Sequence, residues 1–319
     1  MPYWLENLSV YPLVLLSIWL LGSLVLLPQD YQPLTFFRIF AKQLAAKVHP
    51  DPHRATSQQL ISGSLALAVV MLPTLALLAP LYWLSDWPLV LDGLLLYFCL
   101  DFVYYRQQSH KVALAVSQQQ NSRAKDLLQP LVLRQTQSLS SAGLCKATIE
   151  TLWLRTAKQW VGVSFWFLAG GGLAAVAYRL LLLCNQEWND KQSHFRYFGR
   201  PASLLTQWAS LPASLLTALL LAFLTDITGA FRQWRQALSL QLCLPHLLIL
   251  GALASALRIN LAGPVIYQQQ KNQRQRLGPA QLPAVRDVLN ALRLNRQFQL
   301  YSAFIVFIFS LLQLLWLLY

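Results

Sequence analysis

Charged side chains within or beside apolar stretches are the residues of this sequence whose placement most directly indicates chemistry. They are Asp92, Asp101, Arg179 and Asp226. An ionisable group inside a membrane is costly, so it usually pairs within the protein or marks a functional site. The planar guanidinium of Arg179 suits a carboxylate or phosphate ligand. The alternative for each residue is a structural hydrogen bond or a side chain that extends to the membrane interface.

No motif in the sequence predicts a particular reaction or a metal site. The cysteines are Cys99, Cys145, Cys184 and Cys243. They form no Cys-x-x-Cys pair, so we expect buried free thiols rather than disulfides or a zinc site. The five histidines are scattered, and the sequence contains no P-loop, HExxH motif or nucleophile elbow. From the residues alone, the catalytic residues stay unknown.

Membrane-spanning helices are the elements that must position these side chains. The chain is 56% hydrophobic and 12% charged, whereas soluble domains carry about 25% charged residues. A helix needs roughly 20 apolar residues to cross a bilayer. The predicted spans are Tyr11–Leu27, Gln59–Leu84, Trp87–Tyr105, Ala209–Phe231, Leu238–Leu257 and Phe298–Tyr319. The predicted fold is therefore an all-α, polytopic transmembrane protein forming a single domain over residues 1–319.

A further apolar stretch, Trp160–Leu183, is interrupted by three consecutive glycines, Gly170–Gly172. Glycine disfavours a helix interior, and each half is only about 15 Å long as a helix. The stretch is either one continuous span or a re-entrant helical hairpin. The hairpin arrangement places 22 of the 25 Lys and Arg residues on one side of the membrane. This asymmetry follows the positive-inside rule and favours the hairpin.

Two polar segments, residues 106–159 and 258–297, are expected to be cytoplasmic helical loops. The first has apolar residues at helical spacing, which predicts amphipathic helices below the membrane. In the second, Gly263-Pro264 predicts a helix stop, the Gln-rich run 268–276 predicts a solvated loop, and 283–296 predicts another amphipathic helix. The net charge of +13 is explained by such loops, so the bilayer rather than a nucleic acid is the expected partner.

Several ordered stretches resemble the CobD/CbiB family of cobalamin biosynthesis. The closest is Phe165–Leu216, with its glycine cluster, Ala-Tyr-Arg and Arg-Tyr-Phe-Gly. GALASALRINLAGPVIY and LGPAQLPAVRDVLNALRL resemble later family segments. The resemblance covers most of the chain from about residue 30 to residue 297. It implies a bacterial inner-membrane protein and an amide-forming reaction between adenosylcobyric acid and aminopropanol or its phosphate, with Mg-ATP.

The polar signatures of that family are only partly retained. The resemblance implies that Arg134, Thr136 and Glu150 are kept. We expect Arg134, Arg179 and Arg200 to converge where the family binds anionic substrate groups, with Thr136 nearby and Glu150 as a further candidate site residue. The alternative for Arg134 and Arg200 is that they are cytoplasmic anchors. The positions expected to be Asp, Glu, Asp and Asp are Gln135, Leu154, Lys158 and Asn185. The family's Pro-Asn-x-Gly is replaced around Leu244–Leu247. Because Mg²⁺ is usually held by carboxylates and water, these replacements argue against the family reaction.

Two functions from different classes remain open. The first is the ATP-dependent amide synthase, which would use a corrinoid substrate and Mg-ATP. The second is a non-catalytic membrane protein that binds a ligand or regulates a partner, as in the related AmpE proteins. A transporter is a third interpretation, suggested by the interrupted stretch at Gly170–Gly172. The sequence does not predict an oligomeric state.

Overall fold

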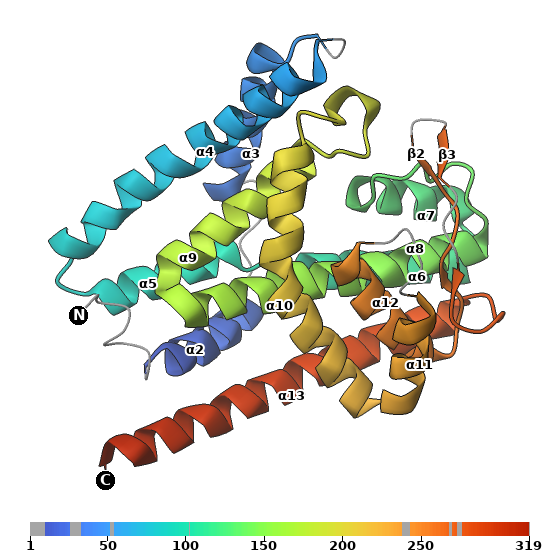
Figure 1. Cartoon of the computed structure of the whole chain (residues 1–319). Coiled ribbons are helices and arrows are strands. Elements are labelled where there is room, and N and C mark those ends of the chain that lie inside the picture. The colour runs from blue at the N-terminus through green and yellow to red at the C-terminus, as the bar shows by residue number, and fades with distance from the viewer. Residues whose placement is uncertain are drawn as a thin grey trace. The chain divides into compact units, whose positions relative to one another are not determined.

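The computed structural model describes residues 10–25, 33–51, 54–101, 103–237, 243–267, 270–272 and 276–318. Those residues are almost entirely helical (Figure 1). The helices are α2 (Tyr11–Leu24), α3 (Pro33–Val48), α4 (Thr56–Leu84), α5 (Pro88–Cys99), α6 (Val103–Ser117), α7 (Asn121–Leu128), α8 (Ser141–Arg155), α9 (Gly162–Glu187), α10 (Arg200–Leu224), α11 (Ile227–Ala237), α12 (Leu244–Leu257) and α13 (Val285–Leu318). Short 3₁₀ turns cover Gln129–Leu131 and Ser193–Phe195, and a π-helical turn, Thr156–Val161, joins α8 to α9.

The chain divides into two compact units. Unit 1 comprises Met1–Leu100, Gly162–Ala209 and Ala303–Tyr319, and unit 2 comprises Asp101–Val161 and Ser210–Ser302. In unit 1, helices α2, α3, α4 and α5 all pack against α9. In unit 2, α8 packs against α6, α7 and α12, and α11 packs along α12.

Long apolar helices confirm the prediction of a multi-pass membrane protein. By length and composition, five helical segments are apolar enough to cross a bilayer: Thr56–Leu84, Pro88–Ser117 (described except at residue 102), Ser141–Glu187, Arg200–Leu224 and Val285–Leu315. Ser141–Glu187 is not one straight helix, because it contains the glycine-interrupted stretch. Their apolar side chains point outward in many places, as with Leu77, Trp83 and Phe304, which are 74%, 93% and 60% exposed. Exposed apolar surface of this extent fits contact with lipid.

Two predicted spans are shorter than expected. Helices α2 and α12 have 14 residues each, which gives a length of about 21 Å. The hydrocarbon core is about 30 Å thick. Residues 26–27 and 238–242 of the predicted spans lie outside the described residues. The described parts of α2 and α12 therefore do not cross a bilayer on their own.

The glycine-interrupted stretch is a helical hairpin. The backbone leaves the helical region at Gly170 and Gly171, and the chain of α9 reverses direction there (Figure 1). The rings of Trp166 and Tyr178 stack with their centroids 6.2 Å apart. Twelve residues of continuous helix would separate them by about 18 Å. The continuous-span alternative is therefore wrong, whereas the position of the hairpin relative to the two membrane faces stays a prediction.

A buried carboxylate holds the apex of this hairpin. Asp92 of α5 is 1% exposed, and its Oδ1 accepts hydrogen bonds from the backbone N–H of Gly172 and from the Tyr82 hydroxyl, both at 2.6 Å. Gly171 has φ +69°, a conformation that glycine adopts without strain. Lipid offers no water to satisfy exposed backbone groups, so a break in a membrane helix needs partners of this kind. These hydrogen bonds give Asp92 a structural role, which the sequence had offered as the alternative to a functional one.

The polar segment 258–297 is less helical than expected. It contains four short strands, β1 (Leu261–Ala262), β2 (Val265–Tyr267), β3 (Gln270–Asn272) and β4 (Arg276–Leu277). β1 pairs antiparallel with β4, and β2 with β3. Left-handed or positive-φ backbone at Arg258, Gly263 and Gly278 ends the helical path and allows these tight pairings. The amphipathic helix expected at 283–296 is present as the first part of α13.

Replacing Gly171 with alanine should destabilise the hairpin. The added Cβ would lie 2.7 Å from the Tyr11 hydroxyl, in a backbone conformation unfavourable for alanine. We expect a loss of about 1–3 kcal/mol, seen as a lower melting temperature in detergent. Gly93→Ala is the matched control, because its Cβ would lie an ordinary 3.6 Å from the side chains of Val14 and Ile18. Equal melting temperatures for the two variants would contradict a strained glycine apex.

Candidate functional site

Helix α8 presents Lys146 and Glu150 one turn apart. Its N-terminus is capped by Ser140, whose hydroxyl accepts a hydrogen bond from the Gly143 backbone N–H at 3.3 Å. Residues at i and i+4 share one face of a helix. This face meets the loop before α8, through Arg134, and the segment from Asn260 to Ala262.

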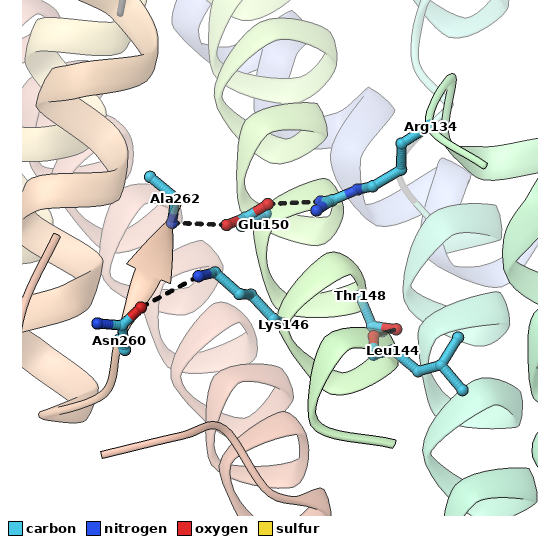
Figure 2. Close-up of polar contacts among 7 residues, drawn as sticks. All are labelled: Arg134, Leu144, Lys146, Thr148, Glu150, Asn260 and Ala262. Carbon is cyan, nitrogen blue, oxygen red and sulfur yellow. Dashed lines mark hydrogen bonds and ion pairs between the residues drawn. The ribbon is translucent and has the colours of Figure 1, made fainter. Parts of the chain in front are cut away.

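Glu150 joins three separate segments of unit 2. Its Oε2 accepts a hydrogen bond from Arg134 Nη2 at 2.5 Å, and its Oε1 accepts one from the Ala262 backbone N–H at 2.8 Å (Figure 2). The side chains of Arg134 and Glu150 are only 13% and 8% exposed. Each carboxylate oxygen therefore already has a strong donor, and the ion pair is largely shielded from water.

Lys146 extends the same site toward the turn after α12. Its Nζ donates to Asn260 Oδ1 at 3.1 Å (Figure 2). A Cβ on Gly263 would lie 3.3 Å from Lys146 Nζ and 3.2 Å from Cγ of Arg276. Lys146 also interacts electrostatically with Glu150, Arg134 and Arg276. We call Arg134, Lys146 and Arg276, with Glu150 among them, the cationic centre.

The local backbone explains why these groups meet. Helix α12 ends at Arg258 in the left-handed conformation, and Asn260 N–H donates to the Gln281 carbonyl at 2.8 Å. Ala262 pairs with Arg276 in the β1–β4 ladder. Ala262 and Gly263 both have positive φ, +55° and +93°. This turn directs the Ala262 N–H at Glu150 and brings the backbone of Gly263 close to Lys146 and Arg276, where a side chain would be crowded.

Thr136 stabilises the loop that carries Arg134. It is fully buried, and both its backbone N–H and its hydroxyl donate to Gln129 Oε1, at 3.2 and 2.7 Å. These bonds tie the loop that carries Arg134 to the preceding 3₁₀ turn. Thr136 therefore positions Arg134 in this structure, and its proposed contact with an anion stays a prediction.

The other two predicted site residues belong to unit 1. Arg179 is 7% exposed in the second half of α9, and Arg200 is exposed at the start of α10. Arg134, Thr136 and Glu150 belong to unit 2. The convergence of all five residues remains a prediction.

Sequence reasoning missed Lys146, Asn260, Gly263 and Arg276 as site residues. The spacing of Lys146 and Glu150 was visible, but charged residues one turn apart are common on solvated helices. Asn260 and Gly263 follow an apolar helix immediately, which is a usable signal for a tight turn. The approach of Arg276 depends on the pairing of β1 with β4, which no local pattern in the sequence indicates.

The donor groups at the centre do not fit Mg²⁺. Within the described ranges, no group of three or more His, Cys, Asp or Glu side chains could hold a metal ion. Glu150 has both oxygens engaged, and its neighbours Arg134, Lys146 and Arg276 are cations. Mg²⁺ prefers oxygen ligands and retains water. The same arrangement suits an anionic ligand, because guanidinium and ammonium groups donate strong hydrogen bonds to carboxylate and phosphate.

Two positions at which the family pattern is replaced contact each other. Lys158 Nζ lies 3.2 Å from His246 Nε2. Lys158 stands where the resemblance implies an acid, and His246 lies in the replaced Leu244–Leu247 stretch. The lysine at position 158 therefore has a polar partner in α12.

Glu150→Gln should destabilise the protein more than the same change at a surface pair. Glutamine keeps the shape of the side chain but leaves Arg134 shielded from water without a counter-charge, a loss we place at about 2–4 kcal/mol. Glu187→Gln is the control, since its partner Arg38 is 68% exposed, and such pairs contribute about 0–1 kcal/mol. Thermal melting in detergent compares the two. A larger loss for Glu187→Gln would contradict a structural role for Glu150.

Comparison with known proteins places this chain among cobalamin-biosynthesis proteins. The family model described as "CobD/Cbib protein" matches residues 15–295. The cobalamin biosynthesis protein CobD of Chromobacterium violaceum is 28% identical over 92% of this chain and 93% of its own length. CobD of Stutzerimonas stutzeri is 26% identical over 86% and 90%, and CobD of Mycobacterium tuberculosis is 28% identical over 55% and 58%. No solved structure matches the chain. With 281 of its 319 residues covered by the family model, the chain belongs to the CobD/CbiB family of cobalamin biosynthesis.

Proposed function

We propose that this chain binds an anionic corrinoid intermediate of cobalamin biosynthesis at the cationic centre, on the cytoplasmic face of the bacterial inner membrane. The observation that carries the proposal is the charge at the centre. Arg134, Lys146 and Arg276 are cations; Arg134 and Lys146 interact with the Glu150 carboxylate, and Arg276 interacts with Lys146. An anionic group on the ligand would offset the remaining positive charge.

The geometry supports two kinds of contact with such a ligand. Arg134 is fixed by Glu150, so its remaining N–H groups have a set direction and little side-chain freedom is lost on binding. Lys146 Nζ and the Arg276 side chain both lie close to Gly263, 3.3 and 3.2 Å from where a Cβ would be, so both can approach one ligand group beside this glycine. The family relationship supplies the ligand class, since the family reaction joins the carboxylate of adenosylcobyric acid to an amine.

The amide-forming reaction itself is the second candidate function. Retention of Arg134, Thr136 and Glu150 favours it, because these residues match the family pattern in order and spacing. The donor set disfavours its Mg-ATP requirement, since Gln135, Leu154 and Lys158 stand where the resemblance implies acids. A corrinoid-binding role without synthesis, as in a regulatory homologue, fits both observations.

Lys146→Met and Arg276→Met should each weaken corrinoid binding about tenfold, equivalent to about 1.4 kcal/mol, because each removes one charged donor. The measurement is calorimetric titration of adenosylcobyric acid into the full chain in detergent or nanodiscs. Lys111→Met is the control, since Lys111 is an exposed lysine on α6 of the same unit and its loss should leave affinity unchanged.

Absence of binding by the unaltered protein would contradict the proposal. So would equal affinities for Lys146→Met, Arg276→Met and Lys111→Met, because the ligand would then bind away from the cationic centre. Melting curves of each variant show whether the protein is still folded.

A further inference from the structure

A cysteine, a histidine and a lysine form a chain of close contacts elsewhere in unit 2. Cys243 Sγ lies 2.6 Å from His246 Nδ1, and His246 Nε2 lies 3.2 Å from Lys158 Nζ. The imidazole thus lies between a potential nucleophile and a cation. A cysteine beside a histidine and a cation is a recurring environment of reactive thiols.

Two backbone features position this chain of side chains. Cys243 is the N-cap of α12, with no side-chain capping bond, so its sulfur lies at the N-terminal end of a 14-residue helix. Lys158 lies in the π-helical turn Thr156–Val161. That turn is fixed by Asn295, whose Nδ2 donates to Thr156 Oγ1 at 2.8 Å. Single π-turns of this kind frequently occur at functional sites.

The direction of the hydrogen bonds from Lys158 through His246 favours reaction at the sulfur of Cys243. A lysine ammonium group can only donate, so Lys158 donates to Nε2, and the imidazole proton then lies on Nδ1, facing Cys243. An N–H donor and a helix N-terminus both stabilise negative charge that develops on sulfur as it attacks. His246 therefore assists the attack and Lys158 orients His246.

Exposure separates Cys243 from the other cysteines. All four are free thiols, but Cys99, Cys145 and Cys184 are buried as expected, whereas Cys243 is partly exposed. The expectation of buried thiols is therefore wrong for Cys243. Among the four cysteines, Cys243 is therefore the one most open to a small reagent, and the buried thiols provide an internal reference within the same molecule.

We propose that Cys243, with His246 and Lys158, is a reactive-thiol modification site for small two-electron oxidants of the peroxide class. In the reaction, the sulfur attacks one peroxide oxygen, an S–O bond forms and the O–O bond breaks. The sulfur is oxidised by two electrons to a sulfenic acid and the peroxide is reduced. The thiol proton and the departing hydroxide form water.

The experiment exposes the full chain in detergent to hydrogen peroxide at pH 7, traps sulfenic acid with a dimedone reagent and quantifies each cysteine by peptide mass spectrometry. We expect Cys243 to react about tenfold faster than a free cysteine derivative, because the imidazole N–H and the helix N-terminus stabilise the charge that develops on sulfur during the attack. Cys99, Cys145 and Cys184 should react far more slowly because they are buried.

Variants separate reactivity from folding. His246→Leu and Lys158→Met should slow modification of Cys243 about tenfold, to the rate of the free derivative, whereas Lys158→Arg should largely retain the rate because it keeps the cation. His110→Leu is the control, since His110 is an exposed histidine on α6. A rate for unaltered Cys243 no faster than that of the free derivative would overturn the proposal, and so would a folded His246→Leu variant with an unchanged rate. The unaltered protein alone gives a decisive result if either variant fails to fold.

Discussion

The ion pair between Arg134 and Glu150 is the interaction on which the organisation of unit 2 most depends. Glu150 is nearly buried, so its charge requires partners, and it obtains them from a loop before α8 and from the backbone of β1. A buried charge with one partner removed is strongly unfavourable. The Glu150 carboxylate thus holds Arg134 in position and also fixes Ala262, which belongs to the turn at Ala262–Gly263 and to the β1–β4 pairing. The surplus of cations around it then makes the centre suitable for an anion.

In unit 1, too, a buried carboxylate satisfies backbone groups where a helix is interrupted, here among apolar helices. The break at Gly170–Gly171 removes helical hydrogen bonds, and Asp92 accepts one from the Gly172 N–H while Tyr82 supports the same oxygen. Gly171 is needed because its backbone conformation and the nearby Tyr11 hydroxyl leave no place for a side chain. In both units a carboxylate of an apolar or amphipathic helix stabilises a segment in which the chain leaves the helix.

The sequence predicted the parts of this protein that depend on hydropathy and local backbone preference. The long apolar helices α4, α10 and α13 follow from composition, and the hairpin follows from Gly170–Gly172 together with the charge asymmetry. Arg134 and Glu150 were identified through family resemblance, although their pairing was not. Lys146 and Arg276 were missed because their approach depends on the β1–β4 pairing, a contact between residues that are distant from α8 in sequence. The short strands were missed because a glutamine-rich run has no strand periodicity, and the described length of α12 differs from the predicted span because hydropathy alone does not fix where a helix begins.

The positions where the resemblance implies acids bear on the proposed distinction between ligand binding and synthesis. A family member that activates a carboxylate with ATP needs groups that hold Mg²⁺, while the described centre offers Glu150 with both oxygens engaged. Lys158, at a position where the resemblance implies an acid, contacts His246 instead. We therefore propose that the chain recognises a corrinoid, which the cations support. Amide formation is disfavoured because the groups around Glu150 do not suit Mg²⁺.

The most direct test is a turnover assay with the purified chain in nanodiscs. Adenosylcobyric acid, aminopropanol phosphate and Mg-ATP are supplied together, and corrinoid products and nucleotide hydrolysis are followed by liquid chromatography with mass spectrometry. We expect the added corrinoid to bind to the protein and no amide product to form. Formation of the amide with stoichiometric consumption of ATP would contradict the proposal that the centre recognises a corrinoid without synthesising the amide.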